Sequence, residues 1–155
     1  MSDIEVRLIH LEPLRVASFW GYGPQPELIA WQKLEAWAKP RGLFDVAQQQ
    51  IFGFNNPNPS HGSPNYGYEL WIAVGPEVLP EGDLRLLDFP GGSYAVTRCD
   101  VRPGQYEHIT AAWMELVAWC ENSPHTILHT QCLEKSVPPP EGCEFALDLY
   151  LPVAG

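Results

Sequence analysis

The 155-residue sequence has little positive charge: 9 lysines and arginines stand against 19 aspartates and glutamates, and the formal net charge is −10. Nucleic-acid-binding proteins gain most of their affinity from clustered lysine and arginine, and the sequence contains neither a basic stripe nor a nucleic-acid-binding motif. We therefore predict no direct nucleic-acid partner. The acidic surplus favours a cationic or neutral small-molecule ligand over an anionic one.

Long apolar runs and paired cysteines are also missing. No hydrophobic stretch approaches the ~20 residues that a membrane-spanning helix needs, and the N-terminus lacks the basic and apolar regions of a secretory signal. The cysteines form no Cys-x-x-Cys pair, so a zinc knuckle or a thioredoxin-like motif is not expected; they are Cys99, Cys120, Cys132 and Cys143. These absences predict a cytoplasmic protein with reduced thiols and no membrane partner.

Cofactor motifs are absent as well. The paired glycines, such as Gly91-Gly92, belong to no phosphate-binding sequence, and neither Gly-x-Ser-x-Gly nor His-Glu-x-x-His occurs. His125, His129 and Cys132 have a spacing that metal ligands use. Pro124 argues against the helix that would align the two histidines. We predict neither a cofactor nor a metal.

The remaining composition is that of a folded domain. Hydrophobic residues make up 45% of the chain and charged residues 18%, which is typical of globular proteins. A chain of this length fits one domain with one core. We predict a single domain over residues 1–155, with halves at approximately 1–80 and 81–155.

The chain contains one internal repeat. Residues 30–37 and 112–119 both read Ala-Trp-x-x-Leu-x-Ala-Trp, at an offset of 82 positions. Proline precedes each segment and proline or glycine follows it, which is typical of helix boundaries. The apolar residues at helical spacing predict one buried face on each helix; they are Leu28, Trp31, Leu34 and Ala38 in the first, and Tyr106, Ile109, Trp113, Leu116, Val117 and Cys120 in the second.

Strand-like segments surround both helices in the same order. Residues 14–20 and 92–99 precede the helices, while 50–54, 68–74, 130–135 and 145–151 follow them. The stretch 53–67, rich in asparagine, proline, glycine and serine, predicts a long surface loop. We therefore predict an α+β protein built from duplicated β-α-β-β halves with pseudo-two-fold symmetry. Its sheet is expected to be mostly antiparallel, with two helices across one face.

Carboxylates within apolar strands are the strongest candidates for a functional site. Glu69 shares a strand face with Trp71, and Asp148 shares one with Tyr150, because side chains alternate along a strand. A carboxylate beside an aromatic ring is typical of a site for a cationic ligand. The alternative is that these acids point into water from a solvated face. Glu134 is a third strand acid, with Lys135 beside it as a surface partner in the alternative interpretation.

The sequence resembles the GyrI-like small-molecule-binding domains, also called AraC-type effector-binding domains, from about Ile4 to Val153. The resemblance rests on segments with family-like motifs: Val16-Ala17, the loop 53–67 that leads into Tyr68-Glu69-Leu70-Trp71, the stretch from Phe89 to Val96, Gly104-Gln105-Tyr106, Leu133-Glu134-Lys135 and Leu149 to Val153. It implies a duplicated fold with a ligand cleft between the halves. It also implies lipophilic, often cationic ligands, with Glu134 as the family's cleft acid and Asp148 and Tyr150 as the acid and aromatic of the last strand.

Three functions stay open at this point. The first is a protein that binds lipophilic, cationic or planar aromatic drug-like molecules, and we favour it because a carboxylate and aromatic rings suffice for binding. We expect a stand-alone protein, because no helix-turn-helix precedes the first strand. Its expected ligand-binding residues are Glu69, Trp71, Tyr94, Trp113, Glu134, Asp148 and Tyr150. The second is a hydrolase of cyclopropane-bearing genotoxins that uses Glu134 or Glu69 to activate water. The third is a protein-interaction module like the relatives that inhibit DNA gyrase. The sequence does not indicate an oligomeric state.

Overall fold

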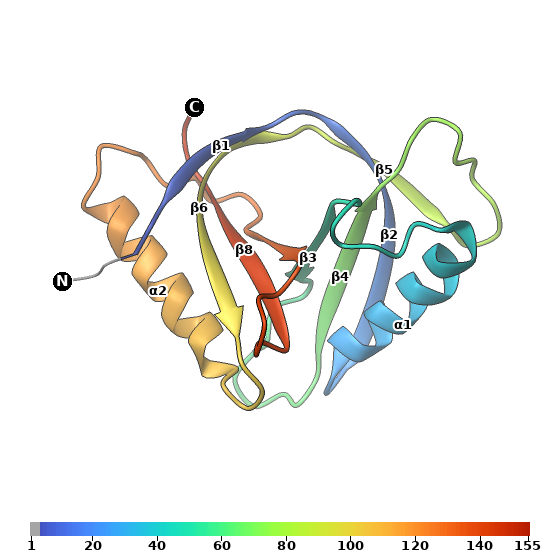
Figure 1. Cartoon of the computed structure of the whole chain (residues 1–155), viewed down its shortest axis with the longest axis horizontal. Helices are drawn as coiled ribbons and strands as arrows, with labels where there is room; N and C mark the ends of the chain where they lie inside the picture. Colours follow the sequence, from blue (N-terminus) through green and yellow to red (C-terminus); the bar gives the residue numbers. More distant parts are fainter. Residues whose placement is uncertain (1–3) are drawn as a thin grey trace. The chain divides into compact units, whose positions relative to one another are not determined.

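The structure, a computed structural model, describes residues 4–155 and has the α+β class predicted from the sequence. Its strands and helices are shown in Figure 1. In chain order they are β1 (Arg7–Leu11), β2 (Leu14–Gly23), α1 (Pro26–Ala38), the single 3-10 turn η1 (Lys39–Arg41), β3 (Ile51–Asn55), β4 (Tyr66–Ala73), β5 (Arg85–Phe89), β6 (Gly92–Val101), α2 (Glu107–Glu121), β7 (Leu133–Val137) and β8 (Phe145–Pro152).

The chain divides into two compact units. Leu14–Phe89 forms one, which we call the middle unit, and the described residues up to Pro13 together with Pro90–Gly155 form the other, the terminal unit. The strand order is β3-β4-β2-β5 in the middle unit and β7-β8-β6-β1 in the terminal unit. The pairings within each unit are antiparallel, in agreement with the predicted sheet.

The two strand orders correspond element by element. The long strands β2 and β6 have ten residues each, β4 and β8 have eight each, and β3, β7, β1 and β5 have five each. The first strand of each half of the chain is exchanged: β1 precedes β2 in sequence but pairs with β6, whereas β5 precedes β6 but pairs with β2. The repeated tryptophan motif thus accompanies a repeated topology, and a gene duplication as its origin stays a prediction.

Helix α1 covers one face of β2 and β4 in the middle unit (Figure 1). Its buried residues follow a spacing of four, Pro26, Ala30, Leu34 and Ala38, and they pack on strand residues such as Leu70. The predicted helix face is wrong for Leu28, which is 57% exposed. Leu28 lies two residues from Pro26, about 200° around the helix, and therefore points away from the sheet.

Helix α2 lies against β6 and β8 in the terminal unit. It buries Leu116 and Cys120, and its partly buried residues Ile109, Trp113 and Val117 pack on the same core as predicted. Tyr106 departs from the prediction: it lies before the first helical turn and is 50% exposed. Its ring stacks on Phe145 and its hydroxyl donates to Glu144, so it packs at the surface rather than in the core.

The long loop of the middle unit is shorter than predicted. Strand β3 continues to Asn55 and β4 begins at Tyr66, which leaves residues 56–65 as the connection. A Cβ atom at Gly67 would overlap the carbonyl oxygen of Asn56. The glycine therefore permits the backbone at the start of the loop to approach β4 closely. The strand β5 (Arg85–Phe89) was not predicted.

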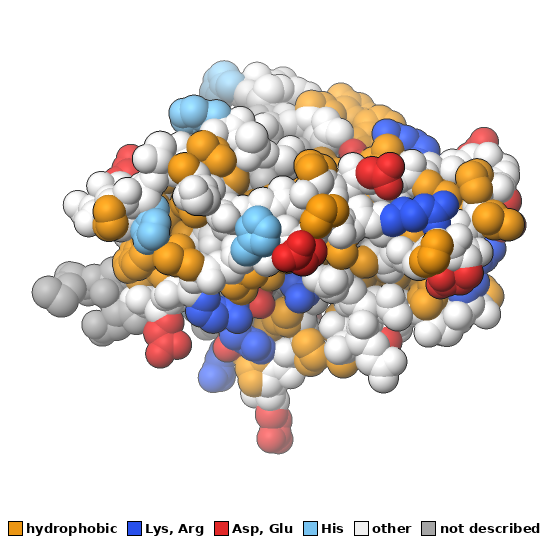
Figure 2. Space-filling view, turned by 90° about the horizontal axis from the view of Figure 1, so that it is seen from above, with side chains coloured by type: hydrophobic (Ala, Val, Ile, Leu, Met, Phe, Trp, Pro, Cys, Tyr) orange, Lys and Arg blue, Asp and Glu red, His pale blue; other side chains and the backbone are white. Residues whose placement is uncertain are grey.

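Among residues 4–155, no helix combines the length and the hydrophobicity needed to cross a membrane. Figure 2 shows one face of the molecule, on which acidic, basic and hydrophobic side chains intermingle.

Candidate functional site

Glu69 is the centre of a hydrogen-bonded cluster in the middle unit. The residue is only 4% exposed, and its carboxylate accepts three hydrogen bonds. Ser18 Oγ and the Trp71 indole Nε1 each donate to Oε2 at 2.7 Å, while Asn56 Nδ2 donates to Oε1 at 3.0 Å. A buried carboxylate needs such donors to compensate for the loss of water. The cluster thus holds Glu69 in one orientation.

The Trp71 indole that donates to this carboxylate belongs to an aromatic group. The ring centroid of Trp71 lies 4.8 Å from that of Phe54 and 5.4 Å from that of Phe89, so three strands contribute to one aromatic group. Glu69 and Trp71 share a strand face, as the alternation predicted. The donors Ser18 and Asn56 were not predicted, although Ser18 lies directly opposite Trp71 in the β2–β4 register.

Asp148 in the terminal unit is a buried acid that forms an ion pair. It is 7% exposed, and Arg7 Nη2 lies 3.0 Å from its Oδ1. That contact is an ion pair without hydrogen-bond alignment, because Oδ1 makes no hydrogen bond within the described chain. Arg98 on β6 and Lys135 on β7 are its cross-strand neighbours. The Asp148 charge is thus already paired with Arg7, which leaves it less capacity for a cationic ligand.

Tyr94 and Tyr150 form an aromatic pair in the same unit. Their ring centroids lie 5.5 Å apart in an edge-to-face arrangement, and both side chains are buried. Burial raises the pKa of both hydroxyl groups, and a second contribution comes from Cys132 for Tyr94 and from Asp148 for Tyr150. Both phenols are therefore neutral at physiological pH.

Trp113 and Glu134 form a third group in the terminal unit. It lies on the face of the strands opposite to that of Asp148 and Tyr150. Glu134 lies opposite Leu149, which packs in the core under α2, and its side chain therefore faces the helix. There Trp113 on α2 donates its indole Nε1–H to Glu134 Oε2 at 3.3 Å. Both side chains are partly exposed. Asp148 and Tyr150 alternate with Leu149 and point the other way.

The seven predicted site residues thus fall into separate groups. Glu69 lies with Trp71, Tyr94 with Tyr150 next to the ion-paired Asp148, and Trp113 with Glu134. Their roles in ligand binding stay predictions. Sequence alternation alone missed the direct contact between Trp113 and Glu134, which links a helix to a strand.

The cysteines do not form a reactive or metal-binding group. All four are free thiols, and burial raises the pKa of Cys99, Cys120 and Cys132. A thiol with a raised pKa stays protonated near neutral pH and is a weak nucleophile. Over residues 4–155, no three side chains of the histidine, cysteine, aspartate and glutamate types gather as metal ligands would.

The sequence of this chain matches the model of one protein family. A model of the GyrI-like small molecule binding domain matches residues 4–154. The chain belongs to this family. The match spans both units, and it confirms the family resemblance and the general function of small-molecule binding.

Solved structures with the same fold are distant in sequence. The EcmrR C-terminal domain has a TM-score of 0.70 and 14% identity, with 98% of each chain covered. A hydrolase from Listeria innocua has a TM-score of 0.66 and 12% identity, with 97% of this chain and 92% of that chain covered. SAV2435 bound to tetraphenylphosphonium has a TM-score of 0.60 and 14% identity, with 98% and 95% covered.

The chain spans 57% of the EcmrR chain in the complex of that protein with DNA. A search of curated proteins finds no match.

Proposed function

We propose that this GyrI-like domain binds lipophilic cations, and that the carboxylate of Glu134 and the indole of Trp113 anchor the ligand. The observation that carries the proposal is the hydrogen bond from Trp113 Nε1 to Glu134 Oε2, between two partly exposed side chains. The indole fixes the carboxylate while its own ring stays beside it. A cation at this place meets a negative charge and an aromatic surface together.

Glu134 suits this role better than the other two strand acids. The oxygens of Glu69 already accept three hydrogen bonds in a buried position, and Asp148 is paired with Arg7. A ligand would have to displace those partners, and each buried donor left unpaired costs about 1–3 kcal/mol. Glu134 is more accessible and is fixed by a donor that a cation does not need to displace. Its position also agrees with the family resemblance in the strand Leu133-Glu134-Lys135.

The aromatic ring and the charge contribute separately to affinity. A cation over an indole face gains roughly 0.5–2 kcal/mol, and the larger values apply where water is excluded. A nearby carboxylate adds a charge interaction that is stronger beside a half-buried strand than in bulk water. These contributions favour large, weakly hydrated organic cations, whose desolvation costs little, over small ones such as ammonium.

Titration with tetraphenylphosphonium tests this proposal, and SAV2435, a protein of the same fold, is known with that cation bound. We expect saturable binding by calorimetry, with at least tenfold lower affinity for neutral triphenylphosphine oxide. Glu134→Gln should weaken tetraphenylphosphonium binding about tenfold, which corresponds to about 1.4 kcal/mol. Trp113→Leu should weaken the binding of both probes.

Glu121→Gln is the matched control, because Glu121 is an exposed acid at the end of α2 and its loss changes the net charge equally. It should leave the affinity for tetraphenylphosphonium unchanged. Equal affinity of the cationic and neutral probes, or an unchanged affinity in Glu134→Gln, would overturn the proposed site.

Hydrolysis and binding to DNA gyrase stay predictions. If the chain is a hydrolase, Glu134 is a better base than Glu69, because the Glu69 oxygens are occupied by donors. Incubation with an electrophilic cyclopropane compound and mass spectrometry of the product detects ring opening by water. A supercoiling assay with added protein tests an effect on gyrase.

A further inference from the structure

A pocket of about 650 Å³ lies beside the long strand β2 of the middle unit, and α1, η1 and residues 81–85 form the rest of its lining. A volume of this size accommodates a drug-sized molecule. Every lining residue belongs to the middle unit, whereas Glu134 and Trp113 belong to the terminal unit. The pocket is therefore separate from the site proposed for lipophilic cations.

Bases outnumber acids in this pocket, which is unusual for so acidic a chain. Its charged lining residues are Lys33, Arg41, Arg85, Glu81 and Asp83, and only nine lysines and arginines occur in the whole sequence. Arg41 is already engaged, because its Nη2 lies 2.6 Å from Glu81 Oε1. Lys33 and Arg85 form no ion pair among residues 4–155. Their charges are therefore not neutralised by a neighbouring acid.

The terminal unit pairs the arginine that corresponds to Arg85. Arg7 and Arg85 are the first residues of the corresponding strands β1 and β5, and Arg7 forms an ion pair with the buried Asp148. The counterpart of Asp148 is Glu69, since each acid lies opposite the residue two positions beyond the arginine's partner on the long strand. The Glu69 oxygens already accept hydrogen bonds from three neutral donors. Arg85 thus lacks the acid that its counterpart has.

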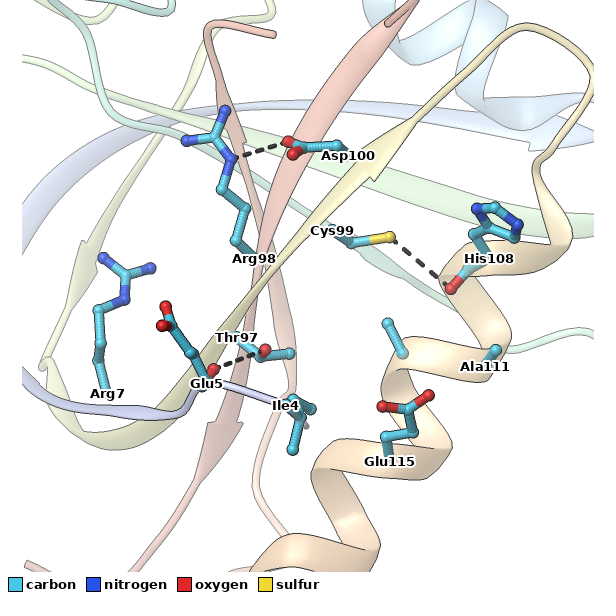
Figure 3. A pocket seen from close by; sticks show the side chains of 11 residues that line it. Ile4, Glu5, Arg7, Thr97, Arg98, Cys99, Asp100, His108, Ala111 and Glu115 are labelled. Carbon is cyan, nitrogen blue, oxygen red and sulfur yellow. Dashed lines mark hydrogen bonds and ion pairs between the residues drawn. The ribbon is translucent and has the colours of Figure 1, made fainter. Parts of the chain in front are cut away.

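The terminal unit also has a pocket between its long strand and its helix, β6 and α2, with a volume of about 570 Å³ (Figure 3). The balance of charge is reversed there, because two arginines stand against three acids, Glu5, Asp100 and Glu115. Both arginines are engaged in ion pairs. In the repeated helix motif, Glu115 takes the position of Lys33. The positive surplus is thus particular to the middle unit and does not follow from the shared topology.

Aromatic rings and a fixed ammonium group complete the lining of the middle-unit pocket. The rings are those of Phe19, Trp20 and Trp37. The centroids of Phe19 and Trp37 lie 5.7 Å apart, and the Arg41 guanidinium lies 4.7 Å from the centroid of Trp37. Lys33 Nζ donates a hydrogen bond of 2.7 Å to the Trp20 carbonyl oxygen, and an ammonium group has two further N–H donors. The pocket therefore combines an aromatic wall with positively charged donors.

We propose that this pocket binds a planar aromatic molecule that carries a single carboxylate. Arg85 and Lys33 bind the carboxylate, and the rings of Phe19 and Trp37 contact the aromatic part. A guanidinium donates two parallel hydrogen bonds to a carboxylate, which fixes the orientation of the ligand. Three bases and two acids give the lining one surplus positive charge. A monoanion balances this charge, whereas a nucleotide with several phosphate charges exceeds it.

Two naphthalene probes of the same shape, 2-naphthoate and the neutral 2-naphthamide, test this inference by calorimetry. We expect 2-naphthoate to bind saturably and at least tenfold more tightly than 2-naphthamide, because only the carboxylate pairs with the two bases. An increase in sodium chloride from about 50 to about 500 mM should weaken the binding of 2-naphthoate and leave that of 2-naphthamide almost unchanged, since salt screens charge pairs. Equal affinities of the two probes, or no binding of 2-naphthoate at millimolar concentration, would overturn the proposal.

Arg85→Gln and Lys33→Gln should each weaken 2-naphthoate binding about tenfold and leave the affinity for tetraphenylphosphonium unchanged. Both side chains are exposed, so the variants should keep the fold. Lys39→Gln is the matched control, because Lys39 is an exposed base in η1 that does not line the pocket; it should retain 2-naphthoate binding. An equal loss in the control, or an unchanged affinity in both pocket variants, would contradict the proposal. A loss of 2-naphthoate binding in Glu134→Gln would also contradict it, because the probe would then occupy the terminal unit.

Discussion

Gly53 and Glu134 occupy corresponding positions in the two units. Gly53 lies opposite Leu70 and Glu134 lies opposite Leu149, and these leucines hold the same place in the eight-residue strands β4 and β8. A Cβ atom at Gly53 would overlap the hydroxyl group of Tyr68. In the middle unit the phenol of Tyr68 therefore occupies the space that corresponds to the space of the Glu134 carboxylate in the terminal unit.

Gly53→Ala should destabilise the protein by about 1–3 kcal/mol, because the added methyl group meets a buried tyrosine that has little room to move. Tyr68→Leu installs the residue found at the corresponding position, Leu147, and removes the obstructing hydroxyl. In urea unfolding the double variant should be more stable than the sum of the single variants predicts. Additive effects would show that Tyr68 and position 53 are not in steric conflict.

This difference between the two units could not be predicted from the sequence, whereas much of the fold could. The tryptophan repeat indicated both helices, and the acids at an offset of 79 residues indicated that β4 and β8 correspond. Alternation did not reveal which face Glu134 takes. Glu134 lies on β7, where polar residues stand on both faces and four of the five residues are partly exposed, so polarity does not distinguish the faces.

The exchange of β1 and β5 was also unpredictable from local patterns. The segment Arg-Leu-Leu-Asp-Phe of β5 has no clear alternation, and its pairing with β2 depends on contacts distant in sequence. The same holds for Ser18 and Asn56. Each is an ordinary surface-type residue in the sequence, and only the strand register brings it to the carboxylate of Glu69.

Glu69→Leu should destabilise the middle unit by about 3 kcal/mol or more. The substitution leaves the donors of Ser18, Asn56 and Trp71 without their acceptor in a buried place, and each unpaired donor costs about 1–3 kcal/mol. Ser18→Ala removes one donor and should cost only about 1 kcal/mol. Chemical denaturation of the two variants compares these losses. A Ser18→Ala effect as large as that of Glu69→Leu would contradict the view that the carboxylate organises the cluster.

Arg7→Leu should destabilise the terminal unit because it removes the ion-pair partner of the buried Asp148. Breaking a buried pair costs about 3–5 kcal/mol, but the Arg7 side chain is 53% exposed, which reduces the expected loss to about 1–2 kcal/mol. Asp148→Asn in the Arg7→Leu background removes the uncompensated charge and should restore part of the stability. No recovery in the double variant would mean that Arg7 contributes through packing instead.

Tyr94→Phe should make the protein less sensitive to alkaline pH. Burial raises the pKa of the Tyr94 hydroxyl above its ordinary value of 10.0, so the folded state holds this proton more strongly than the unfolded state does. The stabilising contribution is complete below pH ~10 and declines as the pH rises through the folded pKa. Urea unfolding from pH 8 to 11.5 should show a steeper loss of stability in the wild type than in Tyr94→Phe. Tyr22→Phe is the control, because Tyr22 is 47% exposed whereas Tyr94 is buried, and it should keep the wild-type slope. If Tyr94→Phe and Tyr22→Phe change the slope equally, the buried tyrosine pair is not the source of the alkaline instability.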